Sequence, residues 1–251
     1  MLVLLVASCK SLPVATPLPA GDPRPDACLA ALVAAGGARQ SLRGVARVAL
    51  SSPAGESRSK QILVVARPAR LRVEVQGLLN QLVAILVSDG ARYALFRASE
   101  RSIEQGEIHP ALLYEVAGLP LRPEEAVDAL LGVPALGELT RRGPAGALSN
   151  GFVRVDLLDA GGAPARRLEC DEEVRLRRIE VRAPDGSLAW QAVYGDYRDV
   201  AGASFPHEIA LEFPAVEASA RVTFQWVELN PELPPGIFAL DVAASDRGGR
   251  G

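Results

Sequence analysis

The sequence contains little of the material from which metal centres and redox centres are built. It has 3 cysteines and 2 histidines among 251 residues. Its net charge is -3 at pH 7, so the chain lacks the overall positive field that attracts nucleic acid. No uninterrupted apolar run approaches the roughly 20 residues that a membrane-spanning helix needs. We therefore expect neither a metalloprotein, nor a nucleic-acid-binding protein, nor a protein with several membrane spans.

Signatures of catalysis are also missing. The sequence has no G-x-S-x-G nucleophile elbow, no P-loop and no G-x-G-x-x-G dinucleotide motif. The two histidines, His109 and His207, lie far apart in the chain, and His207-Glu208 is an isolated pair rather than a metal-ligand pattern. We therefore expect no catalytic residue, no metal site and no cofactor.

The composition is otherwise that of an ordinary folded protein. Apolar residues make up 49% and charged residues 23% of the chain, which excludes wholesale disorder. The length allows one large domain or two small ones with a sizeable core. Aromatic residues are only 5%, so aliphatic side chains must form most of that core.

The N-terminal residues 1–9, MLVLLVASC, resemble a bacterial lipobox. In such a segment a signal peptidase cuts before the cysteine, which is then diacylated. We therefore interpret residues 1–8 as a truncated signal peptide and Cys9 as the lipidated residue. Only eight residues precede Cys9 and none is basic, which departs from a usual signal peptide. The alternatives are a true start further upstream, or a chance match in a frayed apolar terminus.

Residues 9–26 are interpreted as a tether that follows the lipidated cysteine. Proline cannot continue a helix or a central strand, and five prolines favour an extended linker here. They are Pro13, Pro17, Pro19, Pro23 and Pro25. The sequence thus divides into an anchor, a tether, a folded domain over residues 27–242 and a disordered tail over residues 243–251.

The folded domain is expected to be mainly β, in the α+β class. Short segments with alternating apolar and polar residues, separated by turn signals, predict about ten or eleven antiparallel strands. The expected strands are 44–52, 61–66, 70–76, 81–88, 93–97, 152–158, 166–170, 175–182, 188–197, 207–213 and 218–228. A sheet with one apolar face must curl around that face or pack on another layer.

Three short helices are expected beside these strands. The first covers residues 26–35, with Asp26 as its N-cap and Gly36-Gly37 as its end. Two more, over 110–118 and 123–131, separate the two groups of strands. Both are too short to be stable in water, so we expect them to pack on the apolar face of the sheet.

The order of these elements resembles the LolA/LolB lipoprotein-carrier superfamily, and in particular LolB-like outer-membrane lipoproteins. The resemblance rests on the order of four segments rather than on one sharp motif. They are LRGVARVAL (42–50), ARPARLRVEVQGLLNQLVAILVSDG (66–90), VAGLPLRPEEAVDALLGVP (116–134) and LNPELPPGIFAL (229–240). The resemblance implies a single strongly curved antiparallel sheet, an incomplete β-barrel with a short helical lid over an apolar cavity.

The resemblance also implies a function and a set of cavity residues. Carriers of this kind hold the acyl chains of lipoproteins, so the expected partners are acyl chains, the outer membrane and a periplasmic LolA-like carrier. A monomer facing the periplasm is expected. The candidate lining residues are Leu71, Val73, Val75, Leu112, Leu113, Val116, Val222, Phe224 and Trp226. The alternative is that these side chains fill a solid core.

Leu78 and Leu79 lie between two expected strands, where a turn is usually polar. LolB-like proteins carry an apolar residue on a protruding loop at the matching place, which enters the membrane and assists release of the cargo. The resemblance assigns that role to Leu78 or Leu79. The alternative is that the turn folds back and both leucines join the core.

Cys28 and Cys170 are candidates for a disulfide in an oxidising envelope. Two functions remain as alternatives to lipoprotein transfer. One is a lipoprotein that binds or senses lipid without passing it on. The other is a structural accessory lipoprotein with a filled core and a protein partner.

Overall fold

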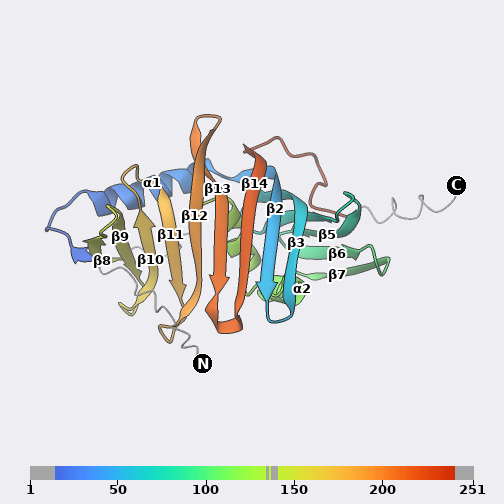
Figure 1. The fold of residues 1–251 in the computed structure, drawn as a ribbon, viewed down its shortest axis with the longest axis horizontal. Coiled ribbons are helices and arrows are strands. Elements are labelled where there is room, and N and C mark those ends of the chain that lie inside the picture. The colour runs from blue at the N-terminus through green and yellow to red at the C-terminus, as the bar shows by residue number, and fades with distance from the viewer. Residues whose placement is uncertain (1–14, 134–135, 137–140, 241–251) are drawn as a thin grey trace, which may run out of the picture.

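The computed structural model describes residues 15–133, 136 and 141–240, which form one antiparallel sheet of 14 strands. The strand order is β1-β8-β9-β10-β11-β12-β13-β14-β2-β3-β4-β5-β6-β7. Strands that follow one another in the chain pair almost throughout, and the pairing of β14 with β2 joins the two halves (Figure 1). Because β1 and β7 are the two edges, the sheet does not close.

Most strands alternate apolar and polar residues, which gives the sheet one apolar face. In the first half the strands are β1 Thr16–Pro17, β2 Ser41–Ser52, β3 Gly55–Ala66, β4 Arg70–Gln76, β5 Leu82–Asp89, β6 Arg92–Arg97 and β7 Ser102–Glu107. In the second half they are β8 Arg141–Ala147, β9 Val153–Leu158, β10 Pro164–Cys170, β11 Leu176–Arg182, β12 Leu188–Val200, β13 Ala203–Phe213 and β14 Ala218–Leu229.

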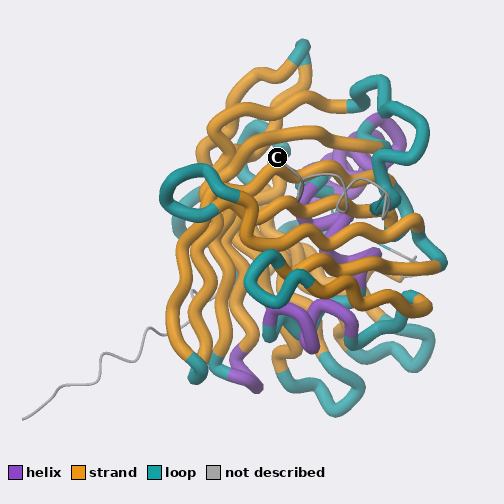
Figure 2. Tube along the Cα trace, turned by 90° about the vertical axis from the view of Figure 1, so that its right-hand side faces the viewer, coloured by secondary structure: helices purple, strands orange, loops and turns teal. Residues whose placement is uncertain are grey.

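The sheet curves around its helices, which Figure 2 shows on the inner side of the bend. The helices are α1 Arg24–Ala38, α2 Leu112–Ala117 and α3 Pro123–Leu130, with a short 3₁₀ turn η1 at Pro214–Val216. Arg67 links two of them, because its guanidinium donates to the Gly36 carbonyl at 3.3 Å and pairs with Asp128 at 3.0 Å. This architecture confirms the expected incomplete barrel with a helical lid.

The sheet has three strands that the sequence did not predict: β1, β7 and β8. Strand β8 contains Gly143, Pro144 and Gly146, and it fits the sheet through a register shift between Arg142 and Ala145. Strand β7 has only one large apolar residue, Ile103, and lies at an edge where polar side chains face water. Hydrophobic alternation therefore could not reveal either strand.

The N-terminal part of the folded body begins earlier than expected. Thr16 and Pro17 pair with Ala147 and Gly146 of β8, so the second part of the expected tether lies on the sheet. Helix α1 begins at Arg24, with Pro23 rather than Asp26 at its N-cap position. It also continues through Gly36 and Gly37, which we expected to end it. Tertiary packing overrides the local preference of glycine here.

The two halves of the sheet are packed differently. The largest fully buried side chains in the half formed by β12, β13 and β14 are aromatic: Tyr194, Phe205, Phe213 and Phe224. Phe205 and Phe224 meet edge to face, with ring centroids 5.7 Å apart. Aromatic side chains fill most of this part of the core, which we call the solid half, whereas the half formed by β2 to β6 provides most of the sheet wall of the candidate site.

Candidate functional site

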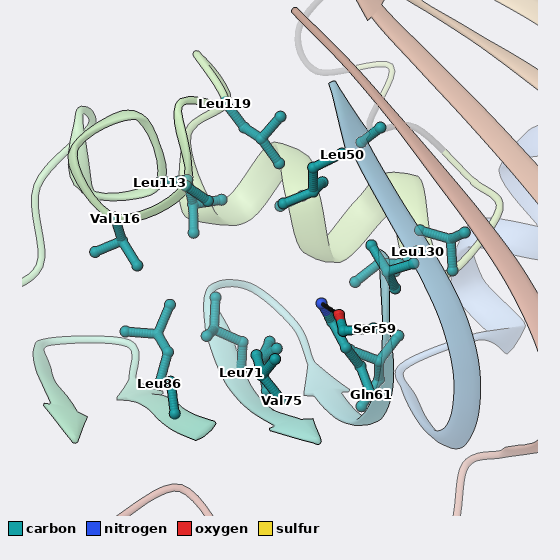
Figure 3. A pocket seen from close by; sticks show the side chains of 18 of the residues that line it. Leu50, Ser59, Gln61, Leu71, Val75, Leu86, Leu113, Val116, Leu119 and Leu130 are labelled. Carbon is teal, nitrogen blue, oxygen red and sulfur yellow. Dashed lines mark hydrogen bonds between the residues drawn. The ribbon is translucent and has the colours of Figure 1, made fainter. Parts of the chain in front are cut away.

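An apolar cavity of about 390 Å³ lies between the inner face of the sheet and the helices α2 and α3. Its sheet wall is formed by β2 to β6 together with Leu211, Ala220 and Val222 of β13 and β14. Its volume is within the range of natural ligand pockets, about 300–1,000 Å³. None of the described residues that line it is aromatic. In Figure 3 the side chains of Leu113, Val116 and Leu119 point across the open space toward Leu71, Val75 and Leu86.

The local sequence explains why this space stays open. Strand β4 places Leu71, Val73 and Val75 on one face, because side chains alternate along a strand. Helices α2 and α3 have only 6 and 8 residues, and their inward side chains are mainly Leu, Val and Ala. Such short, small-residue helices cover the concave face without reaching its bottom.

A few polar groups interrupt the apolar wall. The Gln61 side-chain amide donates to the Ser59 hydroxyl at 3.1 Å, and this pair is visible in Figure 3. Ser57, near the start of β3, and Ser99, in the turn between β6 and β7, also line the cavity. These polar groups can contact a polar part of a ligand, whereas the rest of the wall can contact only hydrocarbon.

Arg97 lines the same end of the cavity and is paired with Glu104 at 3.1 Å. The Tyr93 hydroxyl donates to Glu104 at 2.8 Å. This hydrogen bond and the Arg97 guanidinium hold the pKa of Glu104 below its ordinary value. The Arg97 charge is therefore balanced by an ionised carboxylate.

Six of the nine candidate lining residues form part of the cavity wall. They are Leu71, Val73, Val75, Leu113, Val116 and Val222. The other three assignments are corrected by the structure: Leu112 is fully buried away from the cavity, Phe224 packs in the solid half, and Trp226 is 48% exposed.

A register shift between Phe224 and Trp226 explains the position of the tryptophan. The alternation of β14 predicts Val222, Phe224 and Trp226 on one face. The irregularity in the pairing of β14 with β2 instead buries Val227, and Trp226 faces outward with the Arg43 guanidinium 5.8 Å from its ring centroid. Leu112 differs for another reason, because it lies on the side of α2 that faces away from the cavity.

Several lining residues were missed by the sequence analysis. Leu50, Ser57 and Ser59 come from the β2–β3 hairpin, whereas Leu119 and Leu121 come from the link between the two lid helices. The alternation of β3 could have indicated the serines as inward positions. Because serine is polar, the sequence analysis did not place these residues in an apolar cavity.

The turn between β4 and β5 carries the two leucines outward. Leu78 is 99% and Leu79 is 88% exposed, so the alternative in which they join the core is wrong. The turn is closed by hydrogen bonds from the Gly77 amide to the Gln81 carbonyl at 2.9 Å and from the Asn80 amide to the Gly77 carbonyl at 3.0 Å. The leucines are therefore displayed by an ordered turn.

The exposed apolar surface continues from this turn into the cavity. Leu82 and Val83, at the start of β5, are also large apolar residues exposed to solvent. Val83 is 44% exposed and lines the cavity together with Val75 on the other side of the turn. The cavity therefore reaches the surface beside Leu78 and Leu79.

Cys28 of α1 and Cys170 at the end of β10 are joined by a disulfide, with their Cα atoms 6.0 Å apart. This bond attaches the first helix to β10, in the second half of the sheet. It lies outside the set of residues that line the cavity.

Cys9 and residues 243–251 lie outside the described residues, so lipidation and the tail remain predictions. Among the residues that are described, no group of three or more His, Cys, Asp or Glu side chains could hold a metal ion. Within the same part of the chain, no helix is long and apolar enough to cross a membrane.

Solved structures share this fold. A DUF1329 family protein from Desulfovibrio piger has a TM-score of 0.57 at 9% identity, covering 86% of this chain and 97% of that one. A LolA superfamily protein from Nitrosomonas europaea has a TM-score of 0.54 at 14% identity, covering 85% and 98%. An outer-membrane lipoprotein-sorting domain from Vibrio parahaemolyticus has a TM-score of 0.52 at 9% identity, covering 88% and 97%.

The fold is therefore the LolA-like incomplete barrel. No model of a known protein family matches the sequence, and no curated protein matches it. At such low identity the likeness concerns the fold, and it does not single out the LolB-like members.

Proposed function

We propose that this protein is a LolB-like, membrane-anchored lipoprotein of the bacterial envelope. It holds the acyl chains of lipoproteins or lipids in its cavity and inserts them into the outer membrane. One observation carries the proposal: the apolar cavity opens beside a turn that displays Leu78 and Leu79 to solvent. The lipoprotein-sorting description of one structural relative supports it.

The physical chemistry of the cavity suits this work. Each buried methylene group of an acyl chain contributes about 0.8 kcal/mol, and an aliphatic wall accepts such chains in many conformations. Cys9 would hold the protein at the outer membrane, where a periplasmic LolA-like carrier delivers the cargo. Transfer needs no nucleotide or catalytic group, because cargo can move from a weaker site to a stronger one.

The alternatives make different predictions. A lipoprotein that only binds or senses lipid would use the same cavity, but would not need the exposed leucines. A structural accessory lipoprotein would need neither. The cavity of about 390 Å³ favours a ligand-binding role over a filled core.

Native mass spectrometry tests acyl binding directly. The full chain carrying Cys9→Ala, which prevents lipidation, is incubated with a triacylated lipopeptide or with phosphatidylglycerol. We expect a bound acylated species at one molecule per chain. Val73→Glu should reduce the bound fraction about tenfold or more, because a carboxylate in an apolar cavity opposes hydrocarbon.

Two further variants make the test specific. Val193→Glu adds the same charge at an exposed position of β12 and should leave binding unchanged. Val116→Glu introduces the charge from the helical side of the cavity, in case Val73→Glu does not fold. A chain that stays free of ligand at high lipid concentration contradicts the proposal.

A further inference from the structure

A second surface lies on the outer face of the sheet, separate from the cavity. It is a shallow groove of about 600 Å³ across β14, β2, β3 and the turn that follows β4. The three strands β14, β2 and β3 lie side by side in Figure 1. Among the described residues, four basic side chains and no acidic side chain line it: Arg47, Arg58, Lys60 and Arg221. We call these residues and their surroundings the basic groove. This local positive charge contrasts with the net charge of the whole protein, which is -3.

Most of this positive charge is not neutralised by the protein. Arg221 pairs with Glu208, whereas Lys60 contacts only the neutral Asn80 side chain, at 3.5 Å. In the described part of the chain, Arg47 and Arg58 have no hydrogen-bond or ion-pair partner. Elsewhere on the outer face the arrangement is different.

The outer face of β9 to β11 provides that contrast. There, Arg154 pairs with Glu169 at 2.9 Å and Arg167 pairs with Asp156 at 2.7 Å. Arg178 likewise pairs with Glu180, at 3.3 Å. The arginines on the outer face of β9 to β11 are thus paired with carboxylates, whereas Arg47 and Arg58 of the basic groove are not.

The basic groove adjoins the exposed leucines. Leu78 forms one border of the groove. Lys60 of β3 pairs in register with Gln76, the last residue of β4, so residues 55–59 of β3 extend past β4 beside the turn. Arg58 therefore lies at the level of the turn, and Arg47 lies opposite Lys60 on the next strand, about 4.8 Å away in the backbone.

We propose that the basic groove binds the anionic headgroups of the phospholipid membrane into which Leu78 and Leu79 insert. This inference rests on the proposed function in its use of the leucines as the inserting tip. An apolar tip with cations directly behind it matches a membrane surface, where phosphates lie just outside the hydrocarbon. The groove orients the chain so that the cavity mouth beside Val83 faces the bilayer.

The arrangement also explains how a small tip can stay inserted in the membrane. Two exposed leucines alone provide weak, reversible membrane binding, and stable binding takes a second signal. Basic residues near an anionic surface supply such a signal. Glu56 and Glu212 line a neighbouring depression with Arg58 and Arg221, so acidic groups border the positive area.

Vesicle flotation of the full chain tests the inference. The vesicles consist of phosphatidylcholine alone, or of phosphatidylcholine mixed with phosphatidylglycerol. The Cys9→Ala background removes any contribution from lipidation. We expect tighter binding to the mixed vesicles, and the triple variant Arg47→Gln/Arg58→Gln/Lys60→Gln should lose that binding on the order of 100-fold, at about fivefold per basic residue.

The matched control removes three exposed arginines elsewhere, as Arg92→Gln/Arg141→Gln/Arg198→Gln. It changes the net charge equally and should keep the preference for anionic vesicles. Equal loss in both triple variants, or no preference in the unmodified groove, overturns the inference. Acyl uptake by the cavity is measured separately on the same proteins, so a failure of the proposed function gives a different result from a failure of the basic groove.

Discussion

Tyr194 has a side-chain hydroxyl buried in the solid half of the core without a hydrogen-bond partner among the described residues. Burial raises the pKa of this hydroxyl far above its ordinary value. Tyr197, three positions along β12, provides the opposite case, because its hydroxyl donates to the Leu176 carbonyl. The two tyrosines therefore make opposite contributions to the free energy of unfolding.

We expect Tyr194→Phe to stabilise the protein by about 1 kcal/mol, because it removes an unsatisfied buried polar group. Tyr197→Phe should destabilise it by about 1 kcal/mol, because it leaves a carbonyl without its donor. Urea unfolding of both variants measures the difference. A lower midpoint for Tyr194→Phe as well as for Tyr197→Phe would show that the Tyr194 hydroxyl has a partner in solution.

At the scale of single residues, the sequence predicted which side chains of a strand face the apolar interior. It did not predict where a register shift changes the face. Val73 and Val222 line the cavity as the alternation of their strands indicates. Trp226 does not, because one register shift in β14 reverses the face of every residue beyond it. Such a shift depends on the neighbouring strand, β2, and leaves no mark in the sequence of β14 itself.

The turn between β4 and β5 is the element that connects the cavity with the membrane in our proposal. Leu78 and Leu79 contact solvent, so Leu78→Ser/Leu79→Ser should leave the free energy of unfolding within about 0.5 kcal/mol of the parent. The same variant should weaken binding to vesicles about tenfold per leucine, because each leucine loses its burial in hydrocarbon.

Transfer assays complete this prediction. Delivery of a fluorescent lipopeptide from the protein to vesicles should slow in the double serine variant, while binding of the lipopeptide to the cavity persists. Unchanged delivery would favour a lipoprotein that only binds or senses lipid. Unfolding curves of both proteins serve as the control for folding.

Among the elements, those with strong periodicity could be predicted and those set by neighbours could not. Gly118 ends α2 in the left-handed conformation, with a φ of 69°, as its position predicts. Strands β1 and β8 have weak patterns, and each exists because a partner strand offers hydrogen bonds. Helix α1 passes through Gly36 and Gly37 for a similar reason, since its buried residues Cys28 and Leu32 are held by the core.

At the scale of the whole molecule, the sequence indicated a curved apolar sheet but could not separate a hollow sheet from a filled one. Both need the same alternation of aliphatic residues. The difference comes from size: large aromatic side chains fill the half around Phe205 and Phe224, whereas Leu, Val and Ala on short helices leave space in the other half. Which half receives the aromatic residues depends on the full topology.

The central claim of our account is that the cavity is open space, and replacing Ala126 with a larger residue tests it most directly. Ala126 of α3 lines the cavity, so Ala126→Phe should place its ring in empty space. We expect the free energy of unfolding to change by less than about 1 kcal/mol, whereas overpacking a filled core costs about 1–3 kcal/mol. Ala192→Phe, in the solid half, should show that full cost.

The decisive measurement is the affinity of Ala126→Phe for a fluorescent fatty acid, determined by titration beside its unfolding curve. The account predicts near-parental stability together with at least about a tenfold loss of affinity, because the ring occupies the volume that acyl chains would use. Destabilisation equal to that of Ala192→Phe, or unchanged affinity for the fatty acid, would contradict the account.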